Sequence, residues 1–98
     1  MNESNIIIDI FKKSFIDHPK ILSSSHLIIE KQIKIRKIDI QDLSLLETMS
    51  DEDLNEIIDK IKINNEDLVN KINSNENIDP ELINQLASNF FREINNSI

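Results

Sequence analysis

The sequence predicts an all-α fold, a compact bundle of five to six short helices in a single domain over residues 1–98. The main observation is a pattern that marks helix starts: an apolar residue, then an N-capping residue, then a second apolar residue five positions after the first. It occurs over residues 38–43, 49–54 and 63–68. Asp79-Pro80 marks a fourth start, because proline at the first helical position loses no hydrogen bond.

The first helix is expected over about residues 4–16, and Pro19 ends it because the residue before a proline is pushed out of the α region. Its apolar residues share one face at helical spacing: Ile7, Ile8, Phe11 and Phe15. The other two Phe residues lie in the last predicted helix. Because aromatic side chains bury the most area, we predict that the first and last helices pack on each other.

Residues 20–38 leave two interpretations open. Ser23, Ser24 and Ser25 offer an N-cap for a helix over about 24–37. The partly alternating apolar residues of 31–38 instead favour a strand. A strand would need a partner in another molecule, such as a second copy in a homodimer, because the chain has no second alternating run. We therefore favour the helix.

The remaining helices follow from their caps, and we expect them over about 39–48, 50–62, 64–73 and 79–94. Their predicted N-capping residues are Asp39, Ser50, Asn64 and Asp79. The chain contains no glycine, which usually ends helices in a left-handed conformation. Asn75 and Asn77 are predicted to take that conformation instead.

The net charge of −7 is unevenly distributed. Residues 1–38 carry seven Lys or Arg and four Asp or Glu (+3), whereas residues 39–98 carry four and fourteen (−10). Most of these acids fall at predicted helix starts, where carboxylates complement the helix dipole by about 0.3–1 kcal/mol each. The abundance of Ile and Asn and the lack of Gly are typical of an AT-rich genome.

Composition argues against an enzyme, and no cofactor or metal ion is expected. The absence of Cys excludes a disulfide scaffold and a thiol nucleophile. His18 and His26 are too few for a transition-metal site. Residues 51–62 begin with the spacing of a calcium-binding loop, but Glu56 stands where glycine is required and Lys62 where a bidentate Glu is required.

We also expect no membrane span and no direct binding to nucleic acid. No apolar run approaches the roughly 18–20 residues of a membrane-spanning helix. The basic run between Lys31 and Lys37 stands beside a strongly acidic second half, whereas a recognition helix should be basic. No basic segment precedes Ile6, so we predict an intracellular, cytoplasmic protein, with a mature secreted effector as the alternative.

The run from Met49 to Leu86 resembles the DP-type helical modules of co-chaperones and ubiquitin-shuttle proteins. Those modules string together short helices that often begin with an Asp-Pro step, as at Asp79-Pro80. They usually carry Met-rich faces that hold an apolar client segment. This chain has Ile in place of Met, so the resemblance is not taken as a family assignment.

The function predicted from the sequence is a protein–protein interaction module, such as an adaptor, an assembly subunit or an effector, which binds a partner through an apolar helix face or groove. The uncertain segment has more apolar residues than one helix face needs, and surplus apolar surface is typical of interfaces. The candidate partner-binding residues are Leu27, Ile28, Ile33, Lys34, Ile35 and Phe91. The alternative is an acidic inhibitor, or nucleic-acid mimic, that occupies a basic site on its target.

Overall fold

Six α-helices make up the described part of the chain, and no strand occurs there. The computed structural model describes residues 4–36 and 40–98. In chain order the helices are α1 (Ser4–Ser14), α2 (Pro19–Arg36), α3 (Ile40–Thr48), α4 (Asp51–Asn64), α5 (Glu66–Ser74) and α6 (Pro80–Ser97). The all-α prediction is confirmed. None of these helices combines the length and the apolarity needed to cross a bilayer.

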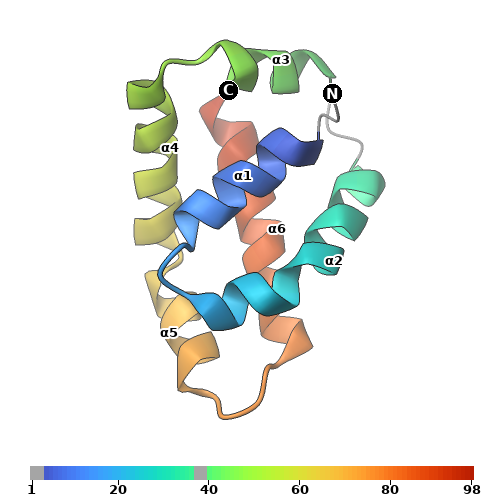
Figure 1. The fold of residues 1–98 in the computed structure, drawn as a ribbon, viewed down its shortest axis with the longest axis vertical. Helices are drawn as coiled ribbons and strands as arrows, with labels where there is room; N and C mark the ends of the chain where they lie inside the picture. Colours follow the sequence, from blue (N-terminus) through green and yellow to red (C-terminus); the bar gives the residue numbers. More distant parts are fainter. Residues whose placement is uncertain (1–3, 37–39) are drawn as a thin grey trace.

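Helix α6 forms the centre of the bundle (Figure 1). It packs against α2, α4 and α5. In the view of Figure 1, α1 crosses in front of α6, α4 and α5 follow one another down the left side, and α3 lies across the top. The molecule measures 39 × 27 × 20 Å, with a radius of gyration of 12.9 Å. This value agrees with the roughly 13 Å of a compact 100-residue domain.

The predicted packing of the first helix on the last is confirmed by two aromatic rings. Phe11 of α1 and Phe90 of α6 lie 5.1 Å apart, centroid to centroid, in an edge-to-face arrangement. Phe15 contacts Phe11 at 4.8 Å, and Phe91 contacts Phe90 at 5.5 Å. The four rings therefore form one connected row through the core, where aromatic pairs add to the stability gained by burial.

Two of the predicted helix starts are confirmed in detail. The Ser50 hydroxyl oxygen accepts a hydrogen bond from the backbone N–H of Asp53 at 3.2 Å. Asp79 Oδ1 accepts from the N–H of Glu81 at 3.0 Å, with Pro80 at the first position of α6. The predicted cap Asp39 lies outside the described residues.

Helix α2 begins five residues earlier than predicted, at Pro19. The His18 carbonyl accepts the N–H groups of Ile21 and Leu22, at 3.0 and 3.1 Å, and so opens the helix. Pro19 thus both follows the end of α1 and starts α2, because its fixed φ suits the first helical position. Ser23 and Ser24 do not cap; their hydroxyls donate back to the Lys20 carbonyl. The strand alternative is wrong for residues 19–36.

Three other local predictions are corrected. Helix α1 ends at Ser14 rather than Ile16. Asn65, not Asn64, stands between α4 and α5, and Ile63 is 70% exposed, so it does not pack as a staple before α5. Asn75 has φ −77° and ψ 135°, which is extended backbone and not the left-handed conformation.

Candidate functional site

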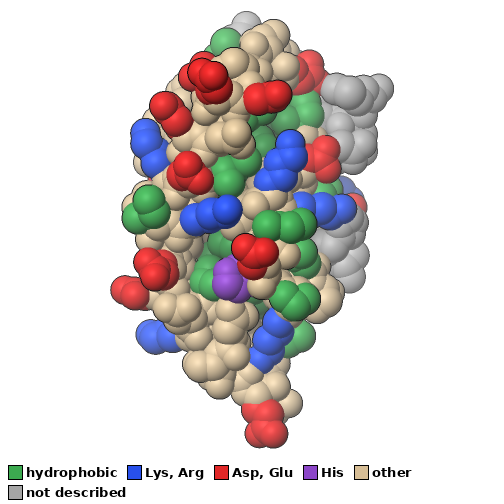
Figure 2. Space-filling view, turned by 60° about the vertical axis from the view of Figure 1, so that its left-hand side comes forward, with side chains coloured by type: hydrophobic (Ala, Val, Ile, Leu, Met, Phe, Trp, Pro, Cys, Tyr) green, Lys and Arg blue, Asp and Glu red, His purple; other side chains and the backbone are tan. Residues whose placement is uncertain are grey.

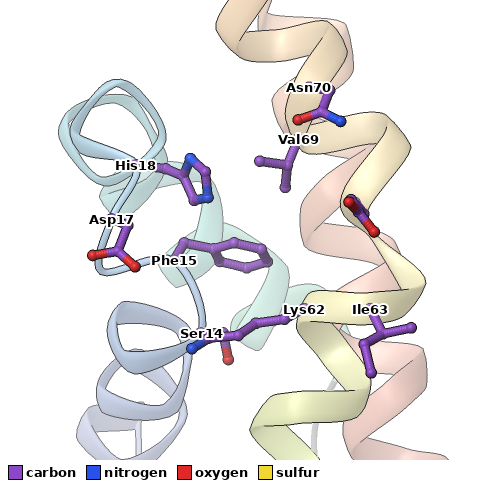
Figure 3. Close-up of a pocket in the computed structure, with 9 residues that line it drawn as sticks. Ser14, Phe15, Asp17, His18, Lys62, Ile63, Val69 and Asn70 are labelled. Carbon is purple, nitrogen blue, oxygen red and sulfur yellow. The ribbon is translucent and has the colours of Figure 1, made fainter.

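A hollow of about 320 Å³ lies between the turn that joins α1 to α2 and the junction of α4 with α5 (Figure 3). One side comes from residues 14–18 and the other from residues 62–70, which are far apart in the sequence. The lining residues are Ser14, Phe15, Asp17, His18, Lys62, Ile63, Glu66, Val69 and Asn70.

The apolar part of the hollow has a buried floor and an exposed rim. Phe15 is 1% exposed and Val69 is 5% exposed, so both belong to the core. Ile63, at the end of α4, is 70% exposed and is the most exposed large apolar side chain of the described residues. A partner that covers the exposed Ile63 side chain would gain roughly 25 cal/mol of free energy for each Å² of apolar surface removed from water.

The break between α4 and α5 shapes the hollow. Asn65 ends α4 and starts α5 with no linker, at φ −111° and ψ 10°. Its backbone carbonyl accepts the N–H of Val69 at 2.9 Å, which opens α5. Lys62 and Ile63 therefore approach the hollow from one helix, and Val69 from another with a different axis.

Two contacts tie the start of α2 to the end of α5. The Asn73 side-chain amide nitrogen lies 2.8 Å from His18 Nδ1. The Lys20 ammonium donates to the Asn75 carbonyl. Both contacts join residues 55 positions apart in the sequence. They hold the two sides of the hollow together.

The contact with Asn73 determines which nitrogen of His18 faces the hollow as a donor. An amide NH₂ group only donates, so this contact is a hydrogen bond in the tautomer of the neutral ring whose Nδ1 is unprotonated and whose Nε2 carries the proton. The second ring nitrogen of His18 lies on the side of the hollow (Figure 3). In this tautomer His18 offers the hollow an N–H donor, in addition to the amide of Asn70 and the ammonium of Lys62.

The remaining polar groups lie at the mouth. Lys62 extends from α4 across the mouth toward Ser14 (Figure 3). The Ser14 hydroxyl is 2% exposed and donates to the Ile10 carbonyl at 2.8 Å, so its hydrogen is already used. Asp17 and Glu66 also line the hollow, and the Asp17 carboxylate lies on the outer side of the turn (Figure 3). No group of three or more metal-binding side chains is found in the described ranges.

The residues predicted as a partner surface are not gathered in this hollow. Phe91 is 0% exposed and therefore lies in the core. Adjacent helical residues point about 100° apart, and both Phe90 and Phe91 are buried because α6 is enclosed on several sides. Ile33 of α2 is partly buried against the core, and Lys34 is exposed. The side chains of Leu27, Ile28 and Ile35 lie outside the described part of the structure.

Comparison of the chain with protein-family models, with curated proteins and with solved structures found no match.

Proposed function

We propose that this protein is a protein–protein interaction module that binds its partner at the hollow between α1–α2 and α4–α5. The observation that carries the proposal is the 70% exposure of Ile63 beside the buried Phe15 and Val69. Exposed apolar surface at a concave site is typical of binding surfaces. Such surface stays in contact with water in the free protein, and its burial in a complex favours binding.

The frame around the hollow supports this proposal. Its floor belongs to the same apolar core that joins the helices, and its two sides are tied by the contacts from His18 and Lys20 to α5. A preformed site loses less conformational entropy on binding than one that must be ordered first.

The placement of the acidic residues favours this function over an acidic nucleic-acid mimic. Seven of the fourteen acids in residues 39–98 lie at the N-cap or in the first turn of a described helix. They are Asp51, Glu52, Asp53, Glu66, Asp67, Asp79 and Glu81. At these positions they complement helix dipoles, so much of the charge has a structural role.

The test is affinity capture from a host extract with three forms of the protein, at low and at high salt. Ile63→Asn removes the exposed apolar side chain from the rim without adding charge. Leu45→Asn is the matched control, because Leu45 is 53% exposed on α3 and does not line the hollow. We expect proteins that are retained by the wild type and by Leu45→Asn and lost with Ile63→Asn.

Retention by all three forms would contradict the use of the hollow. A fourth form, Lys34→Glu, tests the predicted surface of α2, and loss of the partner with this form alone would place the partner there instead. Contacts through apolar groups should persist at high salt, whereas a mimic of nucleic acid should lose its target steeply as ionic strength rises.

A further inference from the structure

Helices α4 and α5 together have the apolar pattern of one continuous helix. Their inward side chains follow one another at alternating intervals of four and three residues across the junction, which is the spacing of a single helix face. This stripe consists of Leu54, Ile58, Ile61, Asn65, Leu68 and Ile72. Figure 2, which turns the α4–α5 side of the molecule forward, shows Lys and Asp or Glu side chains across that side. The pattern therefore specifies one amphipathic helix over residues 51–74, with Asn65 as the polar residue in its apolar stripe.

The two helices nonetheless separate at Asn65. Its φ of −111° and ψ of 10° depart from the roughly −63° and −42° of an α-helix. Helical hydrogen bonds exist on both sides of this residue. Its N–H donates to the Ile61 carbonyl at 3.2 Å, and its carbonyl accepts from the N–H of Val69 at 2.9 Å. The break is therefore confined to a single residue.

Asn65 is an unfavourable residue at this buried position. Its Nδ2 donates at 2.8 Å to the same Ile61 carbonyl that its own N–H uses, and such side-chain bonds compete with the helical ladder. Its Oδ1 has no partner within the described ranges. Asparagine also favours a helix less than leucine or alanine does. An apolar residue would remove the unpaired atom and complete the stripe, so asparagine lowers stability exactly where the chain bends.

The bend changes which helices the stripe packs on. Before it, α4 packs on α1 and α6, and beyond it, α5 packs on α6 and α2. The contacts of Asn73 with His18 and of Asn75 with Lys20 both lie beyond the bend. The hollow is likewise lined from both sides of Asn65, by residues 62–63 and by residues 66–70. The shape of the hollow therefore depends on the angle between α4 and α5.

We infer that Asn65 is a positioning residue: it bends the α4–α5 helix and thereby forms the hollow, at a cost in stability. It contacts no partner itself. A residue that breaks the local pattern of its own helix is typical of functional sites, where stability is given up for a specific shape. The role of Asn65 in the bend stands on the geometry, and its importance for binding rests on the proposed function.

The test compares Asn65→Leu and Asn65→Ala with the wild type, and Asn64→Ala is the matched control at the exposed neighbour. In a continuous helix the N–H groups of Glu66 and Asp67 gain carbonyl partners that the first residues of a separate helix lack. We expect their hydrogen exchange to slow at least about tenfold in both Asn65 variants. The NMR contact between the His18 ring and the Asn73 amide should disappear, and the melting temperature should equal or exceed that of the wild type. Asn64→Ala should leave the exchange and the contact unchanged.

Affinity capture then tests the link to binding. We expect both Asn65 variants to lose the proteins that the wild type and Asn64→Ala retain, although they are no less stable, a combination that a merely structural residue would not produce. Unchanged exchange at Glu66 and Asp67 in both variants would overturn the inference, because packing alone would then make the bend. Lower melting temperatures for both variants would also overturn it. If capture depends on Ile63 but persists in straightened Asn65 variants, the proposed function stands and the positioning role is wrong.

Discussion

Asn65 directs two donors at one acceptor, the carbonyl of Ile61: its side-chain Nδ2 lies 2.8 Å from that oxygen and its backbone N–H nitrogen 3.2 Å. The side chain of Asn65 is buried, and its Oδ1 has no hydrogen-bond partner among the residues that the structure describes. The core therefore holds a side-chain amide whose oxygen is unpaired. Native structures usually avoid this, because an unpaired polar atom in the core lowers stability. Its position coincides with the break that brings α4 and α5 to the hollow.

We predict that Asn65→Asp destabilises the protein by at least about 3 kcal/mol. The change replaces the donor to the Ile61 carbonyl with a second acceptor and buries a carboxylate without a partner. Asn64→Asp is the matched control, because Asn64 is the exposed neighbour, and it should cost no more than about 1 kcal/mol. Chemical denaturation measures both, and equal losses would refute the buried role of Asn65.

In its neutral form, the ring of His18 is predicted to carry its proton on Nε2. The hydrogen bond from the Asn73 amide to Nδ1 selects this tautomer. Long-range ¹H–¹⁵N spectra distinguish a protonated from an unprotonated ring nitrogen. Asn73→Ala should allow both tautomers, and a wild-type ring protonated on Nδ1 alone would show that the contact does not exist as described.

Ser50→Ala should cost about 0.5–2 kcal/mol of stability, because it leaves the N–H of Asp53 without its cap. Ser23→Ala provides the control. Ser23 is also exposed, but its hydroxyl only bonds back within α2, and alanine favours the helix. Thermal unfolding compares the two, and an unchanged melting temperature for Ser50→Ala would exclude the cap as a contributor.

The contact between Phe11 and Phe90 should appear as a coupling energy in a double-mutant cycle. Phe11→Leu, Phe90→Leu and the double variant keep the core apolar while removing the edge-to-face pair. We expect the two losses to be non-additive by about 0.5–1.5 kcal/mol. Strict additivity in urea unfolding would mean that the rings share the core without a specific interaction.

Those parts of the fold that depend on local contacts could be predicted from the sequence. Ser50 and Asp79 satisfy an N–H two or three residues away, so their patterns determine two helix starts regardless of the rest of the chain. The apolar spacing of α1 and α6 likewise indicates which faces are buried. At Pro19 the pattern predicts only the end of a helix, although the same chemistry makes proline a good first helical residue, as at Pro80.

The hollow could not be predicted, because its sides come from segments about 50 residues apart. Asn64 and Asn65 are equally able to cap a helix, and tertiary packing selects the one that is buried. With Asn65 as the N-cap of α5, the staple position before the cap falls on Asn64, and Ile63 stays within α4. Ile63 therefore faces solvent instead of packing as a staple. The hydrogen bond between His18 and Asn73 has no counterpart in any local pattern.

The most direct test of the account is the dissociation constant of a captured partner, measured by calorimetry for the wild type, Ile63→Asn and Leu45→Asn. If the hollow is the binding site, Ile63→Asn should raise the dissociation constant at least about tenfold, as expected for a large apolar side chain that the partner buries completely. Leu45→Asn should change it by no more than about twofold, within the range of contacts that contribute little. Equal constants for the wild type and Ile63→Asn would contradict the account.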